Sequence, residues 1–246
     1  MNAQIGGFIL AAGLGSRLKP WTDHHPKALA MVNGKSLLQR NVEYLQRFGI
    51  KEVVVNVHHF ADQIIAAIEQ NGGWGSTIHI SDESDQVLET GGGLLKAQDL
   101  LKNHKNFVLM NCDILTNLDL GTLIQNHQDT QSIATLAVAH RETSRYLLFN
   151  SNMQMVGWQN IKTGETKLPA AAKLGTAEAQ AFAFSGIHVI SQDIFDKTTL
   201  RGKFSMIDLY LDICAGCRIT AFDHSQDLVL DVGKPEAIAL AETLFA

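Results

Sequence analysis

The residues best suited to chemistry lie near the start of the chain, in a glycine-rich segment that carries two cations. The apolar run Gly7–Ala12 leads into Gly13 and Gly15, Arg17 follows, and Lys27 comes ten residues later. Glycines let backbone N–H groups approach a chain of phosphates closely, and a guanidinium and an ammonium can hold its negative charge. The segment therefore predicts a binding site for a nucleoside triphosphate.

Two commoner glycine-loop motifs do not match this segment. The dinucleotide-binding motif G-x-G-x-x-G needs a third glycine, but Leu18 stands in its place. Gly34-Lys35-Ser36 supplies the end of the P-loop motif, but the first glycine of that motif would fall at Leu29. A plain strand-to-helix turn explains a bare G-x-G, but it does not explain the ordered set of matching residues that follows.

That ordered set resembles the signature of the sugar-1-phosphate nucleotidyltransferases, the nucleoside-diphosphate-sugar pyrophosphorylases. Their pattern G-x-G-x-R-L-x-P-x-T, followed by P-K, corresponds here to Gly13–Thr22 and then Pro26-Lys27. Leu88–Gly93 resembles the base-contacting loop of the N-acetylmuramate-1-phosphate uridylyltransferase branch. Later segments are also similar to family motifs, so the resemblance covers most of the chain: Asn111-Cys112-Asp113, Phe184–Ile187 and Asp231–Glu236.

The resemblance implies a reaction between two anions. An oxygen of a sugar 1-phosphate attacks the α-phosphorus of a nucleoside triphosphate, and pyrophosphate leaves. The attacking phosphate is already deprotonated at neutral pH, so the protein must neutralise charge and align the groups rather than supply a general base. By resemblance, Arg17 holds the triphosphate and the departing pyrophosphate, and Lys27 holds the α-phosphate or the sugar phosphate. Asp113 and Asp231 are expected to ligate Mg²⁺, which prefers carboxylate and water oxygens.

Both aspartates have a further interpretation from their local sequence. Asp113 precedes a predicted helical region and could cap it. Asp231 lies in the apolar stretch Leu228–Val232, where a buried carboxylate would need a partner such as a metal ion. Cys112 replaces the glycine that the family usually has at that position, and this small residue still fits there.

The resemblance also implies contacts with the nucleotide and the sugar. Gly186 would let the sugar approach the backbone. Trp158 stands where many relatives have a glutamate, and its ring would either stack on the sugar or pack in the core. Thr90 could also cap a helix. The expected nucleotide contacts are Leu10, Ala11, Ala12, Gly13, Gly15, Thr90, Gly91 and Gly92.

Composition restricts the class of protein. A length of 246 residues suits one large α/β domain or two small ones. The resemblance implies a single nucleotidyltransferase domain over 1–246, with a nucleotide-binding half over about 1–130 and a sugar-binding half over about 131–246. The net charge of −5 argues against nucleic-acid binding, and the sequence shows neither a signal peptide nor a membrane span, so a cytoplasmic protein is expected. Three cysteines argue against a disulfide framework, and Cys214 and Cys217 are expected to be structural.

The elements that position these residues alternate regularly in the first half of the chain. The order strand, helix, strand, helix implies parallel strands with ligands at their carboxyl ends, where Gly13 and Asp113 lie. The strands are expected at Gly7–Ala12, Glu52–Val57, Thr77–Ser81 and Phe107–Asn111. The helices are expected at Ser36–Phe48, Ala61–Gln70, Leu94–Leu101 and Leu118–His127.

The second half contains more strands with fewer helices between them, which predicts a smaller antiparallel extension or flap. The resemblance implies that this extension binds the sugar. Lys162–Ala179 is expected to be an exposed connection. The predicted class is α/β: a Rossmann-like mixed sheet, mainly parallel and flanked by helices, with that extension. Its strands are expected at Ile133–Ala139, Tyr146–Asn150, Met155–Trp158 and Ala181–Ile190, and its helices at Met206–Ala215 and Pro235–Leu244.

The sequence leaves the substrates open between several hypotheses. The leading one is transfer from UTP to an N-acetylhexosamine-type sugar 1-phosphate such as N-acetylmuramate 1-phosphate, in nucleotide-sugar and cell-wall synthesis. Alternatives are guanylyl or cytidylyl transfer to mannose-, heptose- or polyol-type phosphates, and a sensor of nucleotide sugars without catalysis. All four expected reactive side chains are present, which argues against the sensor. No nucleic-acid or membrane partner is expected, and the oligomeric state stays open.

Overall fold

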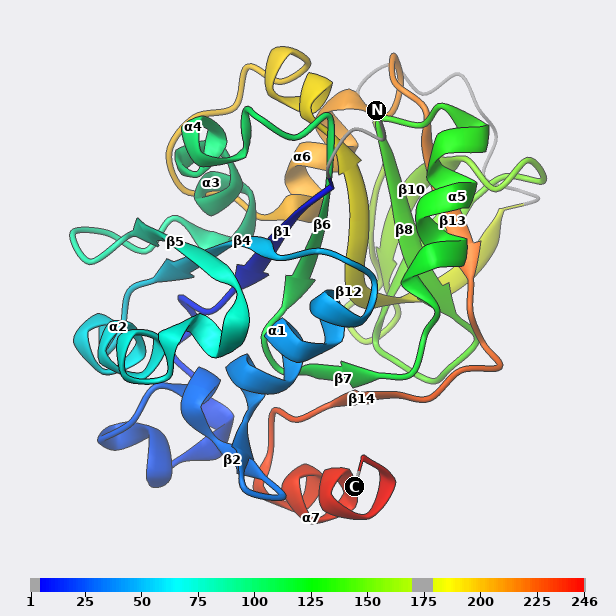
Figure 1. The fold of residues 1–246 in the computed structure, drawn as a ribbon. Helices are drawn as coiled ribbons and strands as arrows, with labels where there is room; N and C mark the ends of the chain where they lie inside the picture. Colours follow the sequence, from blue (N-terminus) through cyan, green and yellow to red (C-terminus); the bar gives the residue numbers. More distant parts are fainter. Residues whose placement is uncertain (1–4, 170–178, 246) are drawn as a thin grey trace.

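A twisted sheet of ten strands runs through the molecule, and the strands predicted for the first half form its parallel part. The protein is represented by a computed structural model, which describes residues 5–169 and 179–245. Figure 1 shows these strands in the middle of the fold. Four strands lie side by side and parallel in the order β6 (Asn106–Asn111), β1 (Gly6–Leu10), β4 (Glu52–Val57) and β5 (Thr77–Asp82).

Helices cover both faces of this parallel part, so its strands are buried on both sides. Successive side chains of β1 point to opposite faces: Ile9 belongs to one buried cluster and Phe8 to the other. The cluster around Ile9 includes residues of α1 (Leu37–Arg47) and α2 (Ala61–Gln70). The cluster around Phe8 includes residues of α3 (Glu89–Lys96), α4 (Gln98–Leu101) and α6 (Met206–Ile213).

The predicted helices α1, α2 and α7 (Pro235–Leu244) are confirmed, but the bounds of the predicted helix Leu94–Leu101 are wrong. The helix begins earlier, at Glu89, and is interrupted at Ala97 before α4. Gly91, Gly92 and Gly93 suggest a loop in the sequence, but they are helical here. The first two pack closely against the segment that precedes α6.

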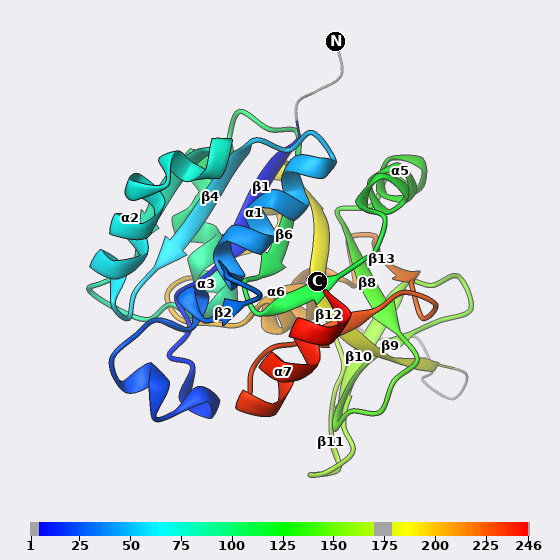
Figure 2. The same ribbon diagram turned by 60° about the horizontal axis from the view of Figure 1, so that its bottom comes forward.

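The antiparallel extension is attached through one long strand, β12 (Gln180–Ser191). Its second half pairs with β6 on one side and β8 (Ala134–Ala139) on the other, and its first residues pair with β9 (Arg145–Phe149). The pairing with β8 continues to Ala183 across an irregularity between Phe184 and His188. β9 then pairs with β10 (Met155–Asn160) and β10 with β11 (Glu165–Lys167), all antiparallel. A mixed sheet with an antiparallel extension is therefore confirmed, and Figure 2 shows β9, β10 and β11 reaching away from the parallel strands.

Three strands appear that the sequence pattern did not predict in this half. β11 lies inside Lys162–Ala179, which was expected to be only a connection; its three residues are exposed, as the composition indicated. Much of the rest of that connection lies outside the described residues. β13 (Ile219–Asp223) pairs parallel with β8, and the three-residue strand β14 (Val229–Asp231) lies outside the main sheet.

A short return of the chain brings the C-terminal part back to the parallel strands. β7 (Ile114–Thr116) follows β6 after a two-residue turn and pairs antiparallel with β14 (Val229–Asp231). The register places Ile114 opposite Asp231. α5 (Leu120–Thr130) follows β7, and α7 lies beside the hairpin of β2 (Met31–Val32) and β3 (Lys35–Ser36), as Figure 2 shows.

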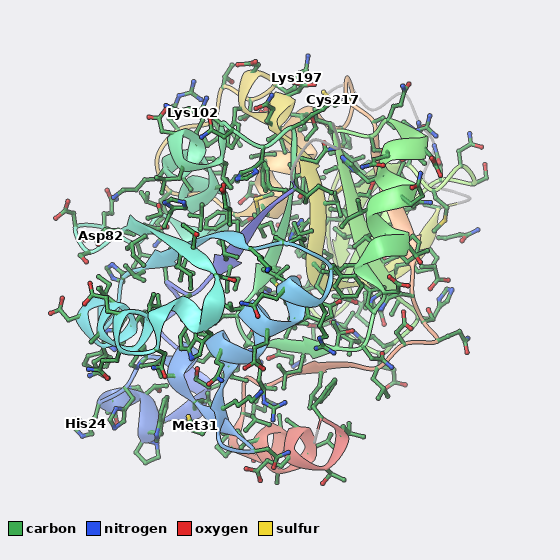
Figure 3. The ribbon with its side chains drawn as sticks, viewed as in Figure 1. His24, Met31, Asp82, Lys102, Lys197 and Cys217 are labelled. Carbon is green, nitrogen blue, oxygen red and sulfur yellow. The ribbon has the colours of Figure 1, made fainter. Side chains whose placement is uncertain are left out.

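None of the helices within residues 5–169 and 179–245 is both long and apolar enough to cross a bilayer. The three cysteines are free, and Cys214 is the C-terminal cap residue of α6. Figure 3 shows Cys217 at the end of the molecule opposite His24 and Met31, which border the glycine-rich segment. Cys217 therefore lies far from this part of the glycine-rich segment.

Candidate active site

The glycine-rich segment leaves β1 and folds into a tight turn that brings its two cations together. Gly15 adopts a left-handed backbone with φ of +62°, and a Cβ there would lie 2.9 Å from Cβ of Lys27 and from Cγ2 of Thr22. The Thr22 hydroxyl donates a hydrogen bond to the Gly15 carbonyl at 2.9 Å. Only glycine fits this conformation and this contact without strain, so Gly15 sets how closely Lys27 approaches the loop.

Two cations and two carboxylates form a cluster beside this turn. Lys27 Nζ donates to Oδ2 of Asp113, and Nη2 of Arg17 lies 3.2 Å from Oδ2 of Asp231. Cross contacts of 4.0 Å join Arg17 to Asp113 and Lys27 to Asp231. We call these four residues the charge cluster. Each cation lies between two carboxylates, so the predicted catalytic and metal-binding side chains do come together in the fold.

The two pairs of the charge cluster differ in burial. The side chains of Lys27 and Asp113 are only 10% and 15% exposed, whereas those of Arg17 and Asp231 are 53% and 46% exposed. The expectation that Asp231 is a buried carboxylate is therefore wrong. β14 pairs only with β7, in a separate two-stranded sheet outside the main one, so its apolar sequence does not bury every side chain.

The capping interpretation of Asp113 is also wrong. The helix that follows begins at Leu120, and Asp119 caps it by accepting hydrogen bonds from the N–H groups of Gly121 at 2.8 Å and Thr122 at 3.3 Å. Asp113 instead lies in the turn between β6 and β7, where its backbone carbonyl accepts from Val232 N–H at 2.8 Å. The carboxylate of Asp113 is thus left for the charge cluster.

Gly233 makes room for Arg17. A Cβ at this position would lie 2.4 Å from Nη2 of Arg17 and 2.5 Å from Oδ1 of Asp231. The guanidinium therefore lies directly against the backbone that follows β14. The missing side chain at position 233 lets Arg17 and Asp231 meet.

A cavity of about 460 Å³ opens beside the charge cluster, at the carboxyl ends of β1, β4 and β6. This is the edge of a parallel sheet at which ligands bind. Ala11, Gly91, Gly92, Asp231, Trp158 and Gly186 do not line it. Eight of the predicted site residues line it: Leu10, Ala12, Gly13, Gly15, Arg17, Lys27, Thr90 and Asp113.

Gly91 and Gly92 pack α3 against the segment before α6. Both of their N–H groups donate to the Phe204 carbonyl, at 2.9 and 3.1 Å. A Cβ at Gly92 would lie 2.2 Å from the Gly202 carbonyl oxygen. Thr90 does not cap its own helix; its hydroxyl accepts from Met206 N–H at 2.9 Å, at the start of α6. These contacts hold the loop before α3 against the cavity.

The two predicted sugar contacts lie on the extension side of the site. Gly186 has φ of +75°, and a Cβ there would lie 2.7 Å from Nδ2 of Asn111, which does line the cavity. Trp158 is half-buried on β10 and packs against the core cluster below α6, with the Lys167 ammonium 5.3 Å from its ring centre. Packing accounts for part of the Trp158 surface, and its contact with a sugar stays a prediction.

Sequence reasoning missed two buried polar residues that line the cavity, Asn56 and Glu83. Each lies at the end of a parallel strand, β4 and β5 respectively. Burial raises the pKa of the Glu83 carboxyl, and hydrogen bonds from Asn56 and Leu88 act in the opposite direction. Asn56 interrupts an apolar run just where a strand should end, and this is a signal that could have identified it. Glu83 stands among other polar residues, so its local sequence carries no such signal.

The carboxylates available for a metal ion are few. Within the described residues, no group of three or more His, Cys, Asp and Glu side chains is arranged to hold a metal ion. Asp113 and Asp231 offer two carboxylates at the same end of the β7–β14 pair, one from directly before β7 and one from the end of β14. Such a set does not suit zinc, which needs three or four nitrogen, sulfur or oxygen ligands from the protein. It suits Mg²⁺, which takes one or two carboxylates together with substrate phosphates and waters.

Comparisons with known proteins agree with this geometry. The profile of the family described as Nucleotidyl transferase matches residues 6–241. N-acetylmuramate alpha-1-phosphate uridylyltransferase of Caulobacter vibrioides is 32% identical over 244 residues, covering 97% of this chain and 96% of that protein. D-glycero-alpha-D-manno-heptose 1-phosphate guanylyltransferase of Campylobacter jejuni is 26% identical over 231 residues, covering 93% and 95% of the two chains.

A solved structure shares the fold. The crystal structure of HddC from Yersinia pseudotuberculosis complexed with GMP-PN superposes with a TM-score of 0.77 and 23% identity, covering 98% of this chain and 100% of that one. With the profile match and the relatives above, the chain belongs to the nucleotidyl transferase family, as a sugar-1-phosphate nucleotidyltransferase.

Proposed function

We propose that this protein transfers a uridylyl group from UTP to a hexosamine-type sugar 1-phosphate, such as N-acetylmuramate 1-phosphate, and releases pyrophosphate. The observation that carries the proposal is the charge cluster beside a cavity formed by a glycine loop. Two cations that already converge suit a reaction in which two phosphate groups must be brought together against their mutual repulsion.

The side chains of the cluster have separate roles in this proposal. Lys27, which is mostly buried, holds the α-phosphate or the sugar phosphate, where charge builds in the transition state. Arg17 is half-exposed and holds the outer phosphates, which leave as pyrophosphate. No side chain has to remove a proton, because the attacking oxygen belongs to a phosphate that is already ionised.

Asp113 and Asp231 are the proposed holders of Mg²⁺. Their carboxylates meet at the same two cations, and the donor set consists of oxygens only. When bound, the ion supplies positive charge that neutralises phosphate oxygens. The protein contributes the placement of the two carboxylates, which comes from the turn after β6 and from the pairing of β7 with β14.

The choice of base and sugar rests on similarity. The segment Leu88–Gly93 resembles that of the uridylyltransferase branch, and the relative from Caulobacter is named for N-acetylmuramate and uridylyl transfer. Gly186 and Trp158 are the proposed sugar contacts, on the side of the site where the antiparallel extension begins. An aromatic ring in place of a carboxylate favours a sugar with an apolar substituent.

Guanylyl transfer is the second candidate. The relative from Campylobacter, which covers nearly the whole chain, is named as a guanylyltransferase for a heptose 1-phosphate. The cavity of about 460 Å³ has room for either base. The two candidates therefore differ in substrate but share the same cluster and the same reaction.

A substrate matrix tests the proposal. UTP, GTP, CTP and dTTP are each paired with N-acetylmuramate, N-acetylglucosamine, mannose and heptose 1-phosphates, and pyrophosphate release is measured with Mg²⁺ present. We expect the fastest release from UTP with N-acetylmuramate 1-phosphate. Fastest release from GTP with a mannose or heptose 1-phosphate would favour the second candidate. No release from any pair, despite nucleotide binding, would favour the sensor.

A further inference from the structure

A single buried amide joins three strand ends beneath the cavity. Asn56 is only 2% exposed and lies near the end of β4. Its Oδ1 accepts hydrogen bonds from the N–H groups of Ala11 at 2.7 Å and Ala12 at 3.3 Å, where the chain has just left β1. Its Nδ2 donates to Oε1 of Glu83 at 2.7 Å, directly after β5. Every polar atom of the side chain is therefore used.

These bonds continue the sheet beyond its last ladder bonds. Leu10 of β1 lies opposite Asn56 in the register of the two strands. After that pair, the N–H groups of Ala11 and Ala12 bind the Asn56 side chain instead of the backbone of β4. On the other side, Cys112 N–H donates to the Leu10 carbonyl at 3.1 Å. The first residues of the glycine loop are thus held from both neighbouring strands.

The other end of the amide reaches the loop that precedes α3. Glu83 is fully buried, and its Oε2 accepts from Leu88 N–H at 3.4 Å. A Cβ at Gly93 would lie 2.6 Å from Oε1 of Glu83. Within the described residues, no side-chain cation lies at ion-pair distance from this carboxyl, so Asn56 is its closest polar partner. Without this hydrogen bond the buried Glu83 carboxyl would be unsatisfied, which costs free energy. The Glu83 side chain and its loop would therefore shift.

We infer that Asn56 is a positioning residue for nucleotide binding. It fixes the distance between the phosphate-binding loop that begins at Ala11 and the loop of Glu83–Thr90 that borders the rest of the cavity. The inference rests on the proposed function only in taking a nucleotide as the occupant of this cavity. The charge cluster and the extension lie outside the Asn56 contacts, so nucleotide affinity should depend on Asn56 much more than sugar 1-phosphate affinity does.

The polarity of the bond to Glu83 provides the test. In Asn56→Asp the new carboxyl still accepts from Ala11 and Ala12, but the amide hydrogen that bound Glu83 is gone. The two buried carboxyls then repel each other or share one proton, so the original bond is lost in either form. In Glu83→Gln the new amide can present a donor to the donor of Asn56. The double variant reverses the bond: the amide at position 83 donates to the carboxylate at position 56, and every other acceptor remains. The total charge equals that of the original protein.

Nucleotide binding is measured directly by calorimetry with UTP and Mg²⁺, and the KM for each substrate is measured by pyrophosphate release. We expect Asn56→Asp to weaken UTP binding by about tenfold, the scale of one lost buried hydrogen bond. Glu83→Gln should weaken it less, because amides can reorient. Asn56→Asp/Glu83→Gln should restore binding to within about threefold. The KM for the sugar 1-phosphate should stay within about twofold throughout.

Tyr210→Phe serves as the control for lost stability alone. It removes a buried hydrogen bond of 2.6 Å to His188, on α6 and away from the cavity, and should lower thermal stability without changing UTP binding. Equal loss of affinity for both substrates in Asn56→Asp, or failure of the double variant to recover while it folds, would overturn the inference. Absence of nucleotide binding in the original protein would instead contradict the proposed function.

Discussion

Lys27 and Asp113 form an ion pair although they are 86 residues apart in sequence. One follows β1 and the other follows β6, and the parallel pairing of those strands brings the two side chains together. In the proposed function they bind different partners, a phosphate and a metal ion. Without those partners, each neutralises the other.

The pairing predicts a gain of binding when the carboxylate is removed. Asp113→Asn leaves Lys27 without its closest counter-charge, so the affinity for UTP without metal should rise several-fold. Pyrophosphate release with Mg²⁺ should fall at the same time, because a metal ligand is lost. Calorimetry with UTP in EDTA checks the first effect. Asp196→Asn, an exposed change with no ion-pair partner among the described residues, is the control. Unchanged metal-free affinity would contradict the prediction.

Arg17→Ala and Lys27→Ala should each lower turnover by roughly 10²-fold or more, as expected when a preorganised charge is removed from the transition state. The fold should survive, because both cations lie on a loop. Turnover and far-ultraviolet circular dichroism are measured together. Lys19→Ala is the matched control: Lys19 is in the same loop, but it pairs with Asp23 and is 62% exposed. Near-normal turnover in both site variants would rule out the phosphate-holding role.

Gly233→Ala should lower turnover by about tenfold or more while leaving stability nearly unchanged. The new methyl group would overlap Nη2 of Arg17, the far end of a flexible side chain, so the guanidinium would move rather than the backbone. Gly216→Ala is the control, because a Cβ there meets nothing within 4 Å. Turnover and thermal melting are compared for the two variants. A strongly destabilised Gly233→Ala would show that the position is needed for folding instead.

Acid should destabilise the protein through buried histidines. Burial lowers the pKa of His188 from 6.5 to about 3 and that of His127 to about 4. Between those values and 6.5 the unfolded chain binds a proton that the folded chain does not, so stability is full above pH 6.5 and falls below it. Each histidine contributes a slope of about 1.4 kcal/mol per pH unit.

His188→Gln removes one of these groups and keeps a partner for the Tyr210 hydroxyl. Its free energy of unfolding, measured by urea titration, should depend less steeply on pH between 6.5 and about 4 than that of the original protein. Identical pH dependence in the two proteins would mean that His188 is not kept neutral in the folded state.

Cys214→Ser/Cys217→Ser should keep full turnover and the same metal content. Both thiols are free, and neither lines the cavity beside the charge cluster. Burial raises the pKa of the Cys214 thiol to about 11, so it is a poor metal ligand at neutral pH. Metal analysis of both proteins, together with turnover, checks this. Zinc bound at one equivalent in the original protein and lost in the variant would contradict it.

Local sequence pattern was sufficient to predict several parts of the protein. The alternation of apolar runs and helical periods predicted β1, β4, β5 and β6, and their order implied a parallel sheet. The glycine-rich segment itself pointed to Arg17 and Lys27 as phosphate-binding cations, whereas the resemblance to the nucleotidyltransferase signature pointed to Asp113 and Asp231.

Which of those residues meet, and which are buried, depends on the long-range pairing of the strands. Asp231 reaches the cluster through the pairing of β14 with β7, a contact between segments more than a hundred residues apart that no local pattern encodes. Its exposure follows from the short separate sheet in which it lies. Nothing in their local sequence pairs Asn56 with Glu83. The sheet register brings them together under the glycine loop, where they share a hydrogen bond. The type of a residue limits the chemistry that its side chain can perform. The long-range pairing of strands determines which other side chains it contacts.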